Sequence, residues 1–356
     1  MLTERLDTAA SLDELHAAMA RLQVEGLWRL GDEVQAEQPR VAAQPYRWRG
    51  ADVLAVLDRA GDLVRHGPAA ERRTVRLVNP GLPASHSATH TLAASVQLLR
   101  PGEVAPTHRH TPVAIRFIIR GRGAYTTVDG ERCTMAPGDL VLTPRWAWHH
   151  HGNAGDEPVV WMDGLDFPLV ILLNGTFFQR YPDGLQPETR SPDASTQRYG
   201  PNLRPAWQRQ PTPDGPLLAF RWEATYAALQ GLAAVDASPY DDVALEYTDP
   251  RHGGHVLPTL ACWVQLLRPG VRTRAHRHTS SAVYHVFRGR GYSVIDGQRL
   301  DWEAGDFLAL PPWAWHEHAS TGPDEAILFS ITDLPVMEAL DLYREEAYPG
   351  DGHQPS

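Results

Sequence analysis

The sequence contains no lysine, and all 33 of its basic side chains are arginine. A chain without lysine cannot form a lysine Schiff base, and it lacks the lysine that phosphate-binding loops and protein kinases require. Because 43 acidic residues give a net charge of −10, neither nucleic acid nor an anionic membrane is expected as a partner. A side chain that binds an anion here must therefore be arginine or a charged histidine.

Cysteine and long apolar runs are also scarce. The two cysteines, Cys133 and Cys262, argue against a disulfide framework, and we interpret each as a small strand residue rather than a nucleophile. The chain has no apolar run of about 18 residues. Its start, Met1–Asp7, lacks the cationic and apolar pattern of a secretory signal. These absences predict a cytoplasmic protein.

Most of the chain consists of two copies of one module. The segment Val96–Gly102 recurs as Val264–Gly270 with an identical sequence. Further matches follow in the same order, namely His108-Arg109-His110 with His276-Arg277-His278, Gly121–Gly123 with Gly289–Gly291, and Trp146–His149 with Trp313–His316. A register kept over so many residue types indicates an internal repeat, which agrees with the two domains that 356 residues suggest.

Each copy has the pattern of a β domain. Short apolar runs at Ala114–Ile119 and Leu140–Thr143 end at glycine, proline or Asp-Gly pairs, and Asp129-Gly130 and Asp296-Gly297 are hairpin turn signals. The spacing predicts a sandwich or barrel of antiparallel strands.

Segments outside the copies have other patterns. Ser11 is expected to cap a helix that ends near Gln23, and helical spacing recurs over 52–64 and 336–346. The segment 186–215 is rich in proline and polar residues and predicts a loop. The expected organisation is a helical region over 1–70, a first β domain over 71–185, a linker over 186–240, a second β domain over 241–335, and a C-terminal helix and tail over 336–356.

Histidine is concentrated in the repeated segments. His108 and His110 lie two residues apart, so on a strand both rings project from one face, and a barrel can bring His149 beside them. Three neutral imidazoles on one face form a site for a divalent transition metal, including iron, zinc, manganese and nickel. A single His-x-His pair is more often a surface feature. The second copy repeats the set as His276, His278 and His316, which favours metal binding.

These motifs resemble the two motifs of the cupin family. The resemblance implies a mainly β bicupin, with two tandem antiparallel β-barrel (jelly-roll-like) domains and N-terminal helices. The usual cupin glutamate that follows His-x-His is replaced by Ala114 and Ala282. Three histidines then leave coordination positions open for a bidentate substrate and dioxygen.

The wider sequence resembles the gentisate 1,2-dioxygenase family, which includes salicylate and 1-hydroxy-2-naphthoate dioxygenases. The resemblance is carried by the segments Glu71–Arg73, Asn79–Gly81, Ala105–His110, Ala114–Phe117, Trp146–Asn153 and Trp161–Asp166. It implies an Fe(II) enzyme that uses O2 to open the ring of a small aromatic hydroxy acid between the carboxyl- and hydroxyl-bearing carbons. With gentisate the product would be maleylpyruvate. The family also implies a homotetramer.

Individual pocket residues follow partly from strand geometry. Arg116 should share the inward face with Ala114, where its guanidinium would bind a substrate carboxylate or, alternatively, a structural carboxylate. His151 should lie on the same side as His149, and the resemblance gives it an acid–base role. The resemblance also implies substrate-binding roles for Arg72, Gln97 and Asp163.

Alternatives remain open at this stage. Salicylate-cleaving members carry a tryptophan where this chain has Ala93, so a ring with a 5-substituent or a different ring is favoured over plain salicylate. The same reaction on a substituted salicylate or 1-hydroxy-2-naphthoate is one alternative. A decarboxylase or isomerase and a non-catalytic metal-binding cupin are others. In the second copy Tyr284 stands in place of Arg116, so that site is expected to bind metal without turning over the same substrate.

Overall fold

The computed structural model describes residues 11–64, 73–200, 203–207 and 215–355. The chain divides into two units, Met1–Val41 and Ala42–Ser356. The first unit contains α2 (Leu12–Leu22), η1 (Leu27–Arg29) and α3 (Gly31–Val34). Ser11 accepts a hydrogen bond from the backbone N–H of Glu14 at 3.2 Å, which confirms the predicted helix start. No helix in the described part of the chain is long and apolar enough to cross a membrane.

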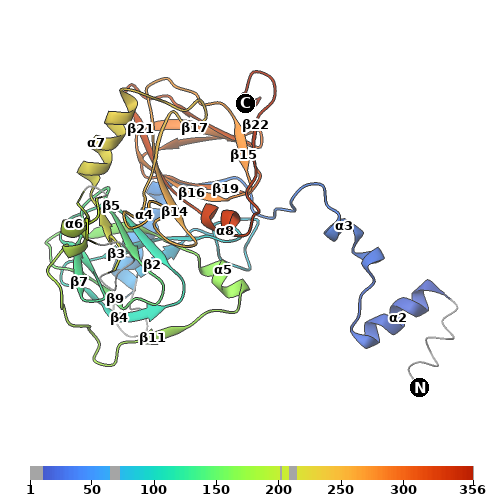
Figure 1. The fold of residues 1–356 in the computed structure, drawn as a ribbon, viewed down its shortest axis with the longest axis horizontal. Coiled ribbons are helices and arrows are strands. Elements are labelled where there is room, and N and C mark those ends of the chain that lie inside the picture. Colours follow the sequence, from blue (N-terminus) through green and yellow to red (C-terminus); the bar gives the residue numbers. More distant parts are fainter. Residues whose placement is uncertain (1–10, 65–72, 201–202, 208–214, 356) are drawn as a thin grey trace. The chain divides into compact units, whose positions relative to one another are not determined.

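The second unit contains two antiparallel β-barrels, drawn in cyan to green and in orange to red in Figure 1. Each barrel combines a six-stranded sheet with a five-stranded sheet, which confirms the mainly β, two-barrel prediction. In the first barrel, the six-stranded sheet has the spatial order β12 (Ala219–Phe220), β8 (Leu140–Thr143), β5 (Ala114–Arg120), β10 (Val159–Leu165), β3 (Ala93–Leu99) and β2 (Arg73–Arg76). The five-stranded sheet has the order β11 (Phe178–Arg180), β4 (Val104–His110), β9 (His149–Asn153), β6 (Ala124–Val128) and β7 (Glu131–Thr134).

The second barrel repeats this arrangement. Its six-stranded sheet has the spatial order β1 (Tyr46–Trp48), β19 (Phe307–Leu310), β16 (Ala282–Arg288), β21 (Ala326–Thr332), β14 (Ala261–Leu267) and β13 (Val243–Glu246). Its five-stranded sheet has the order β18 (Gln298–Glu303), β17 (Arg290–Ile295), β20 (His316–Ser320), β15 (His276–His278) and β22 (Glu345–Ala347). The predicted turns at Asp129-Gly130 and Asp296-Gly297 join β6 to β7 and β17 to β18, with positive φ at all four residues.

The six-stranded sheets are buried on both faces, and the pleat of β5 shows why. Ala114, Arg116 and Ile118 face the interior of their own barrel. Ile115 and Phe117 face a core shared by both barrels, where Phe117 stacks on Phe329 of β21 with ring centroids 4.1 Å apart. A strand of this kind is apolar on both faces except where the barrel interior needs a polar side chain.

The two copies exchange their first strands. Strand β1, which precedes helix α4 (Gly50–Leu63), pairs with β19 of the second barrel, whereas β12, which precedes helix α7 (Trp222–Ala233), pairs with β8 of the first. Asp306 accepts from the backbone N–H of Gly50 at 2.8 Å, and Asp139 accepts from that of Trp222 at 2.9 Å. Each barrel thus places a carboxylate at the N-terminus of the other copy's helix, where negative charge is stabilising.

Two predictions about the connecting segments need correction. The predicted loop over 186–215 contains the short helix α6 (Ala194–Tyr199), and the region called a linker also contains β12 and α7, the counterparts of β1 and α4. The predicted helix over 336–346 is correct only over 336–339. Helix α8 (Leu334–Ala339) ends early, and β22 follows it. Beyond α8, Leu340 and Leu342 are 61% and 54% exposed, and the backbone of β22 pairs with strand β15. The domain boundaries themselves stay a prediction.

Candidate metal centres and pocket

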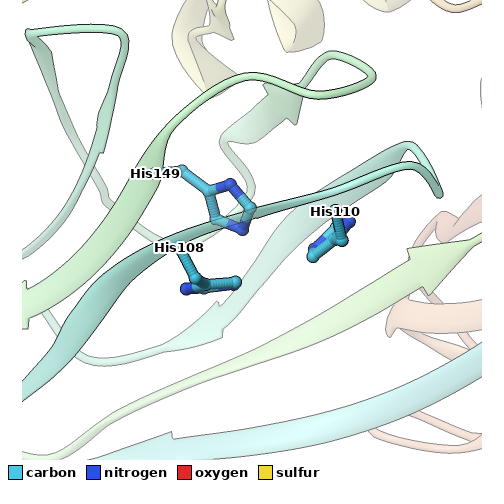
Figure 2. Close-up of side chains that lie close together, drawn as sticks. All are labelled: His108, His110 and His149. Carbon is cyan, nitrogen blue, oxygen red and sulfur yellow. The ribbon is translucent and has the colours of Figure 1, made fainter. Parts of the chain in front are cut away.

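Three histidines meet inside the first barrel. His108 and His110 project from the same face of β4, and His149 begins the adjacent strand β9, opposite His108 in the register. Figure 2 shows the three rings turned toward a common point. One ligand atom from each ring lies within 4.8 Å of the others. The predicted triad is therefore assembled.

Main-chain carbonyls orient all three rings. Each Nδ1 lies within hydrogen-bond distance of a carbonyl oxygen. His108 is 3.0 Å from the carbonyl of Pro106, His110 is 2.8 Å from that of Pro112, and His149 is 3.0 Å from that of Ala147. A carbonyl can only accept, so Nδ1 carries the proton and Nε2 presents a lone pair. This orientation is typical of metal-ligating histidine.

Burial keeps the centre of the triad neutral. Desolvation, followed by the neighbouring His108 and His110, lowers the pKa of His149 well below its ordinary value. Its side chain is 1% exposed, and its Nε2 has no hydrogen-bond partner among the described residues. A buried lone pair without a donor, beside two similar rings, fits a divalent transition metal and no ordinary structural role.

The second barrel contains the same triad. His276, His278 and His316 bring their ligand atoms within 4.8 Å of one another. The Nδ1 atoms of His278 and His316 lie 2.8 and 3.1 Å from the carbonyl oxygens of Ser280 and Ala314. Burial lowers the pKa of His278 to about 4, so this ring is neutral at physiological pH. The sequence prediction of two histidine triads holds for both copies.

A cavity of about 260 Å³ adjoins the first triad. It is lined by His110 and by four of the five pocket residues expected from the sequence, namely Gln97, Arg116, His151 and Asp163. The fifth, Arg72, lies outside the described residues. The inward faces of β3, β5, β9 and β10 therefore bring the expected polar groups together beside the metal ligands.

Arg116 has the inward orientation expected of it, and it also has a protein carboxylate beside it. Its side chain is 4% exposed, its Nη1 donates to Thr143 at 2.6 Å, and its Nε lies 3.4 Å from the Asp163 carboxylate. Asp163 also accepts from the indole of Trp161 at 3.0 Å. The guanidinium is thus held by a buried ion pair at the wall of the cavity.

Gln97 and His151 place further donors at this wall. Gln97 is 2% exposed, its Oε1 accepts from Thr74 at 3.2 Å, and its Nε2 has no hydrogen-bond partner within the described chain. The Nδ1 of His151 lies 3.0 Å from the Thr126 hydroxyl, and the ring centroid lies 5.7 Å from that of His149. His150 turns to the other side of β9, toward Thr107 at 3.0 Å, as expected from strand alternation.

The sequence interpretation missed one cationic residue of the pocket. Arg76 lines the cavity from β2, where the register pairs it with Ser95 and pairs Thr74 with Gln97. Its guanidinium lies 5.0 Å from the ring centroid of Phe167. The sequence signal for Arg76 was its position two residues after Thr74, which places both side chains on one face of a strand. That face could be assigned to the cavity only once the pairing of β2 with β3 was known.

Comparison with known proteins places this arrangement in a family. A cupin domain model matches residues 95–166 and 263–332. The chain is 45% identical to the 5-aminosalicylate 1,2-dioxygenase of a Comamonas species, over 96% of this chain and 92% of that protein. It is 36% identical to gentisate 1,2-dioxygenase 1 of Aquipseudomonas alcaligenes, over 96% and 98%. The chain belongs to the gentisate 1,2-dioxygenase family.

The fold of this ring-cleaving dioxygenase agrees with the assignment. A solved structure of salicylate 1,2-dioxygenase from Pseudoaminobacter salicylatoxidans, described as an adduct with gentisate, has a TM-score of 0.89 to this chain. That match covers 97% of this chain and 96% of the other, at 32% identity. The bicupin fold expected from the sequence is confirmed.

Proposed function

We propose that this dioxygenase cleaves the ring of gentisate between the carboxyl- and hydroxyl-bearing carbons. Both atoms of O2 enter the product, so that maleylpyruvate contains every atom of gentisate and of one O2 molecule. One observation carries the proposal: a single cavity contains a triad ligand, His110, and the buried cation Arg116. An ortho-hydroxy acid needs both groups. The family membership supports the same reaction.

Fe(II) is the proposed metal, held by the Nε2 atoms of His108, His110 and His149. When bound, the ion would supply Lewis acidity and the capacity to react with dioxygen. A set of three histidines leaves positions open on an octahedral ion, and Ala114 supplies no fourth ligand. The protein therefore leaves room for substrate beside the metal.

The side chains of the cavity bind and orient the acid. Arg116 is proposed to bind the carboxylate, because a planar guanidinium offers paired donors to a carboxylate and Asp163 holds it in place. The Nε2 of Gln97, which has no partner among the described residues, would donate to a substrate oxygen, and His151 would exchange a proton with the substrate hydroxyl. Arg76 adds positive charge, so an acidic protein has a locally cationic pocket.

A 5-aminosalicylate is the second candidate substrate. It is favoured by the 45% identical relative from Comamonas, which is named for that substrate. Ala93, buried at the start of β3, also stands where salicylate-cleaving relatives carry a larger tryptophan. 1-Hydroxy-2-naphthoate remains the third candidate, since a 38% identical protein of a Nocardioides strain is named for its cleavage.

Oxygen uptake tests the proposal directly. Protein loaded anaerobically with Fe(II) should consume one O2 per gentisate and form a ring-cleavage chromophore. Comparing gentisate, 5-aminosalicylate, salicylate and 1-hydroxy-2-naphthoate ranks the candidates by kcat/KM. Arg116→Gln should lower kcat/KM strongly. Arg120→Gln is the matched control, because Arg120 lies on the same strand but pairs with Asp58 at the surface. Absence of uptake with all four acids would contradict ring cleavage and favour a non-catalytic cupin.

Assembly and location are proposed from the family alone. We propose that the protein is cytoplasmic and forms a homotetramer. Light scattering of the purified protein measures the molar mass and so tests the tetramer. A monomer at micromolar concentration would contradict the tetramer without affecting the proposed reaction.

A further inference from the structure

His151 of the first barrel and His318 of the second occupy matching positions, on β9 and on β20, with different hydrogen-bond surroundings. Both side chains are buried, at 1% and 2% exposure. The register places a hydroxyl residue directly opposite each ring, Thr126 on β6 and Ser293 on β17. The Nδ1 atoms lie 3.0 and 2.7 Å from these hydroxyl oxygens. Which atom of each pair donates decides which ring nitrogen carries the proton of the neutral histidine.

In the first barrel the hydroxyl has an acceptor on its other side. Thr126 Oγ1 donates to the Sδ atom of Met135 at 3.3 Å, and both side chains are buried. A thioether sulfur can only accept, so the hydroxyl oxygen is left to accept from the Nδ1–H of His151. This arrangement makes two hydrogen bonds, whereas a hydroxyl that donates to Nδ1 makes one. The Nε2 atom of His151, whose ring lines the cavity, then has a free lone pair.

In the second barrel the hydroxyl has a donor on that side. Trp302 occupies the position of Met135, and its Nε1–H donates to the Oγ atom of Ser293 at 2.9 Å. Ser293 is fully buried, and within the described chain its own proton has no acceptor other than Nδ1 of His318. The Ser293 hydroxyl therefore donates to Nδ1, because a buried hydroxyl proton without an acceptor is costly. Nε2 of His318 then carries the ring proton, so the two rings are opposite tautomers.

We propose that Thr126 and Met135 are positioning residues, which hold His151 as the tautomer whose Nε2 accepts a proton from the substrate. This inference rests on the proposed ring cleavage, in which His151 exchanges a proton with the substrate hydroxyl. The O–H bond of the substrate breaks, an Nε2–H bond forms, and the imidazolium keeps its Nδ1–H bond to Thr126. His318 presents a protonated Nε2 at the matching position and cannot act as this base.

Neutron diffraction from crystals of the deuterated full-length protein tests the tautomers without substrate or turnover. The crystals are kept at about pH 8, where histidine side chains of ordinary pKa are neutral. We expect deuterium on Nδ1 of His151 and on Oγ1 of Thr126, directed at Met135. His318 should carry deuterium on Nε2. Deuterium on Nε2 of His151 would overturn the proposal. Failure of ring cleavage would not alter these deuterium positions, so the tautomer assignment and the proposed function fail separately.

Variants of the two positioning residues test the effect on turnover. Met135→Leu keeps the approximate volume but removes the acceptor, so the Thr126 hydroxyl turns to Nδ1 of His151. The kcat of gentisate cleavage should fall about 10-fold while KM changes less than about 2-fold, because the proton acceptor acts in the transition state. Thr126→Val should also lower kcat, and Thr126→Ser should keep it within about 3-fold of the wild type.

Met162→Leu is the matched control for the sulfur. Met162 is as buried as Met135 but packs in the core shared by the barrels, so its variant should keep kcat within about 2-fold of the wild type. Circular dichroism confirms that each variant is folded. Equal effects of the two methionine variants would refute the role of the Met135 sulfur. A loss of kcat in Thr126→Ser as large as that in Thr126→Val would refute the role of the hydroxyl.

Discussion

Substitution of Arg116 by methionine separates a substrate-binding role from a purely structural one. The side chain is buried and lies 3.4 Å from Asp163, so the variant loses an ion pair whatever the substrate does. At that distance, with an effective dielectric constant of about 20, the attraction is about 5 kcal/mol before desolvation. Removing one partner of a buried pair typically lowers the free energy of unfolding by about 3–5 kcal/mol. The variant should therefore be less stable.

The effect on activity has a different origin. Loss of a charge-assisted contact to the substrate carboxylate should remove about 3 kcal/mol of binding in the transition state, which lowers kcat/KM about 100-fold. The second variant, Arg116→Met with Asp163→Leu, removes both charges. Its free energy of unfolding should recover by more than about 1 kcal/mol relative to Arg116→Met, while kcat/KM stays at least as low.

Urea unfolding followed by tryptophan fluorescence measures the stability, and an oxygen electrode measures kcat/KM. Arg120→Met is the control, because its pair with Asp58 is exposed and should contribute less than about 1 kcal/mol. If the double variant recovers both stability and activity, Arg116 serves only to neutralise the buried charge of Asp163, and the carboxylate-binding role is refuted.

Three further predictions concern pH, packing and metal removal. Burial raises the pKa of Asp333 to about 6 from 3.8, so the stabilising contribution of its protonated form is present below about pH 4 and is lost as the pH rises through 6. The free energy of unfolding of Asp333→Asn should therefore rise by about 3 kcal/mol relative to that of the wild type between pH 4 and 7. Parallel pH profiles of the two proteins in urea unfolding would contradict this. Gly164→Ala should destabilise by about 1–3 kcal/mol, because its Cβ would lie 2.6 Å from Cδ1 of Ile331, and Ile331→Val should relieve part of that loss in the same assay. Chelation should abolish oxygen uptake but leave the far-ultraviolet circular dichroism unchanged, because carbonyls already hold the rings of the first triad.

The sequence could predict those features that depend on local periodicity and on the repeat. Strand alternation placed Ala114 and Arg116 on one face, and the repeated His-x-His pattern predicted both triads. The exchange of β1 and β12 could not be predicted, because it depends on which sheet edge each short strand meets. The C-terminal strand β22 was predicted as part of a helix because the spacing of apolar residues contains no information about the backbone hydrogen bonds that the edge of β15 offers.

Other pocket residues escaped for the same reason. Arg76 lines the cavity beside the first triad through the register of β2 with β3, and Glu345 lines the cavity beside the second triad through the register of β22 with β15. Both registers join segments that lie far apart in the chain. Their residue types, arginine and glutamate, are the commonest of surface groups and give no signal of burial or function. Long-range register therefore limits what a single sequence reveals about a site.

The repeat also explains how one chain can hold two unlike sites. The barrels are joined reciprocally: Asp166 of the first accepts from Thr259 of the second at 2.7 Å, and Asp333 of the second accepts from Thr91 of the first at 2.5 Å. Removal of either hydrogen bond would affect both barrels at once. Residues that face a barrel interior escape that constraint, because each touches only its own cavity. The change from Arg116 to Tyr284 could therefore occur without disturbing the other site. The same reasoning predicts that exchanging interior residues between copies alters ligand preference while leaving the joint between the barrels intact.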